Sequence, residues 1–214
     1  YEYYQYSHIG KFSCKKCGFG NYEPYITAEK IDLEKPVFTA DGFEYSPKLN
    51  SIYNVYNMTA VAAAAKLYNI DQKITNSVIS TYTVNNGRME NFMLGDRETT
   101  LNLAKNPVGA NMTLRVMNET SGEKELLFVL NDNVADGLDV SWIWDINFSI
   151  FERVTRVVTS GTRAYDIAVR IKCSGFEASK IVVCPELDKA VECLAETPGR
   201  KYVIANYTAV QPTR

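Results

Sequence analysis

The sequence predicts an α/β protein whose larger, C-terminal part contains a mostly parallel sheet with helices on both faces. Apolar runs such as Leu126–Leu130 alternate along that part with segments of helical periodicity, which is the order of strands and crossover helices. The runs are continuously apolar, as expected for strands buried on both faces. A length of 214 residues allows one large domain or two small ones.

Composition is that of an ordinary globular protein, with 46% apolar and 22% charged residues. The net charge of -2 and the lack of a Lys/Arg cluster give no reason to expect a nucleic-acid partner. No run of 18 apolar residues and no signal peptide is recognisable. Five cysteines, one close pair and three scattered singles, do not resemble a secreted disulfide framework. We therefore expect a cytoplasmic protein.

The first part of the chain predicts small β elements followed by two helices. Residues 1–25 indicate short hairpins with a turn at the close cysteine pair, and residues 26–50 indicate short strands separated by turns. Residues 53–69 contain five alanines and neither Gly nor Pro, which favours a helix. Asp71 is expected to cap a second helix that continues to about Tyr82.

The polar segment 83–90 is typical of a linker, and we place the domain boundary after residue 88. Beyond it the pattern predicts the following elements: strands over 91–95, 99–104, 126–130, 156–159, 181–184 and 202–205, and helices over 107–118, 163–173 and 185–195. Ligands of parallel sheets bind at the carboxyl ends of strands. This rule selects the loops after Leu130, Thr159 and Ala205 as candidate sites.

Cys14 and Cys17 form a C-x-x-C-G sequence, the knuckle of a zinc ribbon, in which two thiolates can share one face of a tetrahedral ion. A structural zinc needs four ligands, so two further cysteines are expected before Tyr1. His8 is a conceivable third ligand, although a single histidine there is more commonly packed or hydrogen-bonded. The alternatives for the pair are a redox role or chance.

Three further groups could bind a nucleotide or phosphate. Asn54 and Asn57 are three residues apart and would lie on one helical face, where amides can bind a purine or ribose, although capping explains them equally well. Arg88 could bind a phosphate, whereas most such arginines are solvated. Lys105 and Asn106 precede a helix whose N-terminus favours anions.

Segment 131–145 combines four aspartates with both tryptophans of the chain, directly after a buried strand. It could be a solvated acidic loop, a Mg²⁺ site, or the source of a carboxylate that orients a histidine in a catalytic triad. The chain contains only His8 and no suitable nucleophile nearby. A triad would therefore have to be completed by another polypeptide.

Several segments, taken in order, resemble one family. Tyr53–Ala65, YNVYNMTAVAAAA, is similar to the Asn-x-x-Asn-x-x-Ala-Ala helix of Mur ligases, and Gly87–Glu90, GRME, resembles their linker. The segments KNPVGANMTLRVM, NDNVADGLDVSWIWD, SGTRAYDIAVRIK and YVIANYTAV are similar to the C-terminal domain of the MurT family. The resemblance implies that residues 1–88 end a Mur ligase central domain, with half a zinc ribbon at about 1–25. Residues 89–214 would form a Rossmann-like C-terminal domain.

MurT proteins pair with a GatD-like glutaminase and amidate the α-carboxyl of D-glutamate in lipid II, giving D-isoglutamine. Glutamine supplies the ammonia, and ATP with Mg²⁺ activates the carboxyl as an acyl phosphate. The resemblance implies that Asn54, Asn57 and Arg88 contact ATP. It also implies that Lys105 and Asn106 face nucleotide or substrate, and that the protein acts at the inner face of the plasma membrane.

The resemblance further implies that an aspartate of segment 131–145 orients the catalytic histidine of the glutaminase. Asp139 is the first candidate, Asp136 the second and Asp145 the third. The phosphate-binding loop of Mur ligases is expected before Tyr1, so this fragment alone should be inactive. Ser149 stands where the family has an acidic residue, and no role is assigned to it.

Two other functions compete with this one. The first is a peptide-adding Mur ligase or a folylpolyglutamate synthetase relative, which is not expected to carry the half zinc ribbon or the WIWD sequence. The second is a zinc-ribbon interaction module without catalysis, which would have no need for the Asn-x-x-Asn helix or for GRME.

Overall fold

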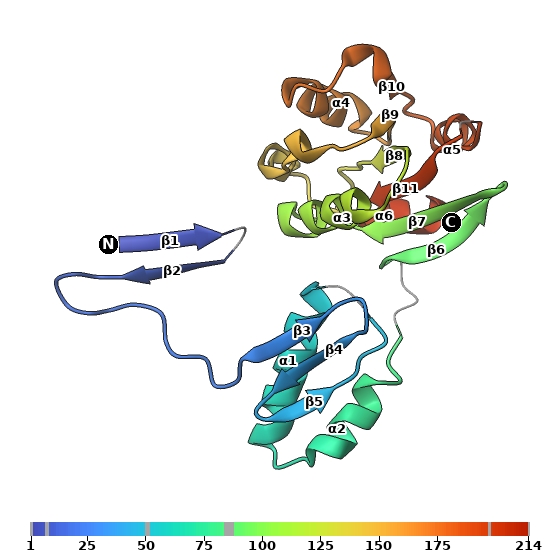
Figure 1. Ribbon diagram of the computed structural model, residues 1–214. Coiled ribbons are helices and arrows are strands. Elements are labelled where there is room, and N and C mark those ends of the chain that lie inside the picture. Colours follow the sequence, from blue (N-terminus) through green and yellow to red (C-terminus); the bar gives the residue numbers. More distant parts are fainter. Residues whose placement is uncertain (1, 7–8, 50–51, 84–87, 197, 214) are drawn as a thin grey trace. The chain divides into compact units, whose positions relative to one another are not determined.

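The computed structural model describes residues 2–6, 9–49, 52–83, 88–196 and 198–213 (Figure 1). The chain divides into two compact units, Tyr1–Thr83 and Val84–Arg214. The division falls inside the segment predicted as a linker. The candidate ligand His8 and the Asn86-Gly87 sequence of the linker lie outside the described residues.

The first unit contains a hairpin and a three-stranded meander, all antiparallel. The hairpin pairs β1 (Glu2–Tyr6) with β2 (Ile9–Ser13). The meander consists of β3 (Ala28–Asp32), β4 (Val37–Ala40) and β5 (Phe43–Tyr45). The short strands predicted for this part are confirmed.

Helices α1 (Ile52–Leu67) and α2 (Gln72–Ile79) follow, and buried side chains of both join a core with Phe38 and Tyr45. Asp71 caps α2 as predicted, accepting a hydrogen bond from the Lys73 amide at 2.8 Å. The helix ends at Ile79 rather than near Tyr82. Hydroxyls at positions 80 and 81 donate to carbonyls of the last turn, which competes with continued helix formation.

The second unit is built on a six-stranded sheet in the order β10-β9-β8-β11-β7-β6 (Figure 1). Its strands are β6 (Glu90–Leu94), β7 (Arg97–Leu103), β8 (Lys124–Val129), β9 (Val154–Ser160), β10 (Ile181–Val183) and β11 (Arg200–Ala205). Only β6 is antiparallel to its neighbour, and it pairs with β7 as a hairpin at one edge. The mostly parallel sheet is therefore confirmed.

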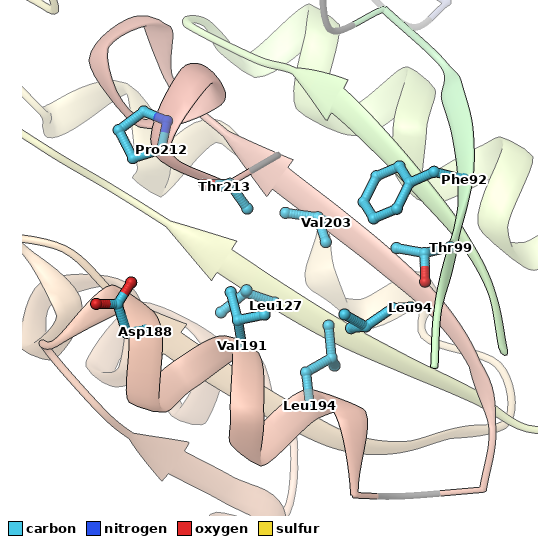
Figure 2. A pocket seen from close by; sticks show the side chains of 10 residues that line it. All are labelled: Phe92, Leu94, Thr99, Leu127, Asp188, Val191, Leu194, Val203, Pro212 and Thr213. Carbon is cyan, nitrogen blue, oxygen red and sulfur yellow. The ribbon is translucent and has the colours of Figure 1, made fainter. Parts of the chain in front are cut away.

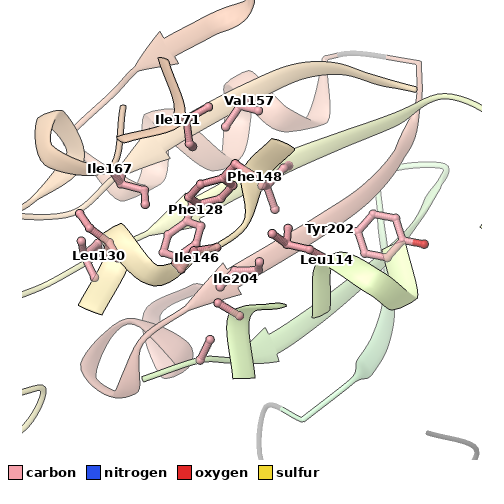
Figure 3. Packing of buried hydrophobic residues seen from close by; sticks show 14 of the residues in the cluster. Leu114, Phe128, Leu130, Ile146, Phe148, Val157, Ile167, Ile171, Tyr202 and Ile204 are labelled. Carbon is pink, nitrogen blue, oxygen red and sulfur yellow. The ribbon is translucent and has the colours of Figure 1, made fainter. Parts of the chain in front are cut away.

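One face of this sheet is covered by α3 (Pro107–Glu119) and α4 (Ala164–Cys173). Figure 3 shows how Leu114 of α3 and Ile167 of α4 pack with Phe128 of β8 in a buried apolar cluster. The 3-10 helices η1 (Ser141–Asp145) and η2 (Phe148–Ile150) add Ile143 and Phe148 to the same cluster. A third 3-10 helix, η3 (Ala178–Lys180), precedes β10.

The opposite face is covered by α5 (Leu187–Ala195) and α6 (Tyr207–Thr213). Helices on both faces were expected, but α6 was not. Its seven residues include Pro212, a poor helix former beyond the first turn. The helix is stabilised instead by the burial of Ala209 and Val210 against the sheet. Among the described residues, no helix is both long and apolar enough to cross a bilayer.

Candidate functional site

The carboxyl ends of the parallel strands form one polar edge, at which the three loops selected from the sequence are joined by Asn131. The Asn131 amide donates to the side chain of Asn206, which follows β11, at 3.1 Å. The Asn206 side chain donates back to the Asn131 carbonyl at 2.6 Å. The Thr162 amide, after β9, donates to Asn131 Oδ1 at 3.1 Å. These hydrogen bonds bring together the three loops that the sequence selected as candidate sites.

Asp132 and Asp166 share Arg163 at this edge. Arg163 forms ion pairs with Asp132 at 3.2 Å and with Asp166 at 2.8 Å. The Thr162 hydroxyl also donates to Asp132, at 2.7 Å. The pKa of Asp132 is lowered by the Thr162 hydrogen bond first and by Arg163 second, and Arg163 lowers the pKa of Asp166. The network joins the loop after β8 to the first turn of α4.

We predict that this network makes the protein sensitive to acid. The pKa of Asp132 in the folded protein lies below its value of about 3.9 in the unfolded chain. Ionised Asp132 therefore stabilises the fold at pH values above about 3.9. The stabilisation is lost as pH falls through the folded pKa. Asp132→Asn should therefore show a shallower fall of Tm between about pH 5 and pH 2. The exposed Asp96, replaced in the same way, is the control, and equal slopes in both variants would contradict the prediction.

Asp136 is hydrogen-bonded to Thr208 of α6 through both of its carboxylate oxygens. Its two carboxylate oxygens accept hydrogen bonds from the Thr208 amide at 2.9 Å and from the Thr208 hydroxyl at 2.5 Å. The same hydroxyl accepts from the side chains of Asn131 and Asn133. Asp136 thus holds the loop against the start of α6.

Asp139 is exposed and is engaged only locally. Its carboxylate accepts a hydrogen bond from the Ser141 amide at 2.8 Å, which is the main cause of its lowered pKa. Within the described part of the chain, Ser141 is the residue that donates hydrogen bonds to the Asp139 carboxylate. Asp145 is exposed as well, and its backbone carbonyl accepts from Asn111 of α3 at 3.3 Å. Of the three candidate aspartates, Asp139 and Asp145 therefore present accessible carboxylates.

Arg170 of α4 holds the segment that follows Asp139. Its guanidinium donates to the carbonyls of Ile143 and Ile146 and lies 5.6 Å from the Trp144 ring and 5.5 Å from the Phe148 ring. Such stacking is favourable when a cation lies within about 6 Å of an aromatic ring. Ile143, Ile146 and Phe148 are buried. This segment therefore has a fixed conformation next to the exposed aspartate.

Two of the hollows that the described residues form adjoin α6, and both have a mainly apolar lining. One, of about 350 Å³, lies at the polar edge and is lined in part by Asn131, Gly161 and Thr162. The other, of about 210 Å³, lies between α5 and the β6–β7 hairpin on the sheet face opposite η1 (Figure 2). Its described lining is mainly apolar, with Asp188 as its one charged residue. The described lining of the first hollow includes Asn131 of the acidic loop but none of the loop's aspartates.

The candidate nucleotide residues have different surroundings. Asn54 of α1 is buried, whereas Asn57 is exposed. The two side chains therefore differ in access to solvent, although their spacing places them on one side of the helix. Arg88 is exposed just before β6, and Lys105 is exposed between β7 and α3. The Asn106 side chain caps α3 by accepting from the Gly109 amide at 2.9 Å. Its side-chain oxygen is thus already used in helix capping.

The two candidate metal ligands share one turn. The Gly18 amide donates to the Cys14 carbonyl at 2.8 Å, and the Cys14 amide donates to Phe19 at 2.7 Å. Hydrogen bonds from the Cys17 and Lys16 backbone lower the pKa of Cys14, as suits a thiolate ligand. The described residues hold no group of three or more potential ligands. In this turn the structure therefore shows two potential ligands, Cys14 and Cys17.

Sequence reasoning did not identify Thr208, Arg163 or Arg170 as parts of the site. Each lies far along the chain from the loop that it contacts, so no local spacing marks it. Arg163 and Arg170 stand in the segment SGTRAYDIAVRIK, and Thr208 stands in YVIANYTAV. The resemblance of these segments to MurT was the available signal.

Comparison with known proteins gives a consistent result. A family model described as "MurT ligase C-terminal" matches residues 103–210. A lipid II isoglutaminyl synthase (glutamine-hydrolyzing) subunit MurT from Staphylococcus aureus (strain COL) is 32% identical over 215 residues, covering 99% of this chain and 49% of the relative. The chain thus spans about half the length of this relative.

Solved structures share the fold. A pseudomurein peptide ligase type C from Methanothermus fervidus matches with a TM-score of 0.68 and 19% identity, covering 95% of this chain and 43% of the ligase. A Mycobacterium tuberculosis folylpolyglutamate synthase complexed with ADP and AMPPCP matches with a TM-score of 0.60 and 17% identity, covering 86% and 45%. At these identities the likeness shows the fold alone.

Proposed function

The chain belongs to the MurT ligase family, and from this premise we propose that it is part of the ligase subunit of a lipid II isoglutaminyl synthase. The enzyme would amidate the α-carboxyl of D-glutamate in lipid II, with glutamine as the ammonia source and ATP as the activating nucleotide. A GatD-like glutaminase would be its partner, and the reaction would take place at the inner face of the plasma membrane.

The observation that carries the proposal is an exposed aspartate in a segment that also exposes three apolar side chains. Asp139 lies in the loop after β8, and the hydrogen bond from Ser141 lowers its pKa, which favours the carboxylate form. Val134 and Leu138 of the same loop are 91% and 73% exposed, and Trp144 is 54% exposed. Exposed apolar groups around a charged residue are typical of a surface that another protein covers.

In the glutaminase reaction, the partner's cysteine would attack the glutamine carboxamide and its histidine would transfer the proton to the departing ammonia. Water then releases glutamate, so that glutamine and water give glutamate and ammonia. The Asp139 carboxylate would accept a hydrogen bond from that histidine, fix its orientation and stabilise its protonated form. Asp145 is a less favoured source of this carboxylate, because it is the last residue of η1 and does not belong to the exposed loop before it.

In the ligase reaction, the D-glutamate carboxylate would take the γ-phosphate of ATP, releasing ADP. Ammonia then attacks the acyl phosphate carbonyl and releases phosphate, leaving the amide. Mg²⁺ would neutralise the phosphate charge when it is bound. Asn57 and Arg88 are exposed residues suited to contact ATP, and Lys105 offers a cation to phosphate or substrate. Asn54 would support the helix from its buried position.

We further propose a structural zinc site in the full-length protein. Cys14 and Cys17 would supply two thiolates, and two more cysteines would complete the tetrahedron. The turn geometry and the lowered pKa of Cys14 support the assignment. The ion would stabilise the ribbon and would take no part in the amidation.

The proposal is tested with the full-length ligase subunit purified together with its glutaminase. Lipid II, glutamine, ATP and MgCl₂ should give amidated lipid II by mass spectrometry, with release of glutamate and ADP. Omission of ATP should abolish the product, and ammonium chloride should replace glutamine. Addition of an amino acid to the stem peptide, in place of an amide, would instead indicate a peptide-adding ligase.

A further inference from the structure

Thr208 is a polar residue of α6 that no step of the proposed reaction uses, yet its hydroxyl is saturated with hydrogen bonds. It donates to Asp136 Oδ2 at 2.5 Å and accepts from Asn131 Nδ2 at 3.1 Å and from Asn133 Nδ2 at 2.9 Å. A hydroxyl has one donor and two acceptor positions. All three are therefore occupied by residues of the loop after β8.

These hydrogen bonds hold the part of the loop between Asn133 and Asp139, which makes few other hydrogen bonds to described residues of the domain. Most of its residues are exposed there, and Gly137 has a φ of +88° and lies in open space, where a Cβ would meet no heavy atom within 4 Å. The Asp136 amide donates to the Asn133 carbonyl at 2.8 Å, which makes a tight turn. Among the described residues, the hydrogen bonds from this turn to another element all go to Thr208.

The geometry points to Thr208 as a positioning residue for Asp139, an inference that rests on the proposed function. Two residues, Gly137 and Leu138, separate Asp139 from the carboxylate held by Thr208. On the other side of Asp139, Val140 is buried and the Ser141 amide holds the carboxylate. Asp139 therefore lies between two fixed points, and one of them is supplied by α6. Asp136 acts through Thr208 and would not itself meet the partner's histidine.

The test compares Thr208→Val with Thr208→Ser in the full-length, glutaminase-bound protein. Valine removes the hydroxyl at nearly constant shape, whereas serine retains it. Because misplacement of a catalytic group by 1 Å can cost about 100-fold in rate, kcat for glutamine hydrolysis should fall by about 10- to 100-fold in the valine variant. The KM for glutamine should change little, and serine should restore most of the rate.

Thr213→Val is the matched control, because Thr213 is in the same helix and its hydroxyl bonds within that helix, to the Ala209 carbonyl. It should leave glutamine hydrolysis unchanged. Amidation with ammonium chloride should also be unchanged in Thr208→Val, since that route bypasses the glutaminase. Loss of the ammonium-dependent rate would indicate general unfolding and would overturn a positioning role.

A double-mutant cycle separates the roles of Thr208 and Asp136. If Asp136 acts through Thr208, the Thr208→Val and Asp136→Asn losses will not multiply in the double variant. Multiplied losses would place Asp136 itself against the histidine and overturn the inference. A normal rate in Thr208→Val combined with a large loss in Asp139→Asn would reject the positioning role alone. No loss in Asp139→Asn would instead reject the proposed function.

Discussion

Replacement of Asp139 by asparagine is expected to lower glutamine hydrolysis by the assembled enzyme by roughly 10³- to 10⁴-fold, the loss typical of removing the carboxylate from a histidine-containing triad. Asparagine has the same shape but cannot stabilise the protonated histidine. The fold should be unaffected, because the side-chain oxygen of asparagine can accept the same local hydrogen bond from a backbone amide two residues further on. The Ser141 amide would therefore keep its acceptor.

The measurements are glutamate release and complex formation, made on the same protein. The variant should bind the glutaminase normally and should still amidate lipid II when ammonium chloride replaces glutamine. Asp188→Asn, on α5 at the other sheet face, is a suitable control. Unchanged glutamate release from Asp139→Asn would remove Asp139 from the site and leave Asp145 as the accessible alternative.

The second large effect is expected from Gly161→Ala. Gly161 follows β9 with a φ of +91°, and a Cβ there would lie 2.5 Å from the Leu130 carbonyl oxygen and 2.6 Å from Asn131 Oδ1. Both are atoms of the segment that joins the three loops of the polar edge. Backbone strain and the overlap together should lower the free energy of unfolding by roughly 2 to 4 kcal/mol.

Gly175→Ala is a close control, since Gly175 has a φ of +96° and a Cβ there would meet no heavy atom within 4 Å. Chemical denaturation of both variants separates the two contributions. Gly175→Ala should show the strain alone, about 1 to 2 kcal/mol, and the additional loss in Gly161→Ala should report the contact with Leu130. Equal losses in the two variants would contradict a close approach of the loops.

Much of the fold could be predicted because its signals are local. The apolar run before Asn131 and the helical periodicities around it marked strands and helices in the correct order. Asp71 was identified as a cap because capping acts over two residues. Helix α6 was missed, since its stability comes from burial against the sheet and from the bond between Asp136 and Thr208.

The site was predicted only in outline. The rule for parallel sheets selected the three loops that Asn131 joins, and composition selected the aspartates. Arg163 and Arg170 gave no signal of this kind. Their hydrogen-bond partners Asp132, Ile143 and Ile146 lie 24 to 31 residues away in sequence, so spacing cannot reveal these contacts.

The sequence by itself determined the class of fold, the edge of the sheet at which the candidate site lies, and the resemblance to MurT ligases. These follow from short-range periodicity and from the order of motifs. Only the tertiary structure distinguished among the aspartates. Asp136 is held by Thr208, 72 residues away, whereas Asp139 is held by Ser141, two residues away. A long-range hydrogen bond thus ties the half-buried Asp136 carboxylate to α6, whereas a local one leaves the Asp139 carboxylate exposed.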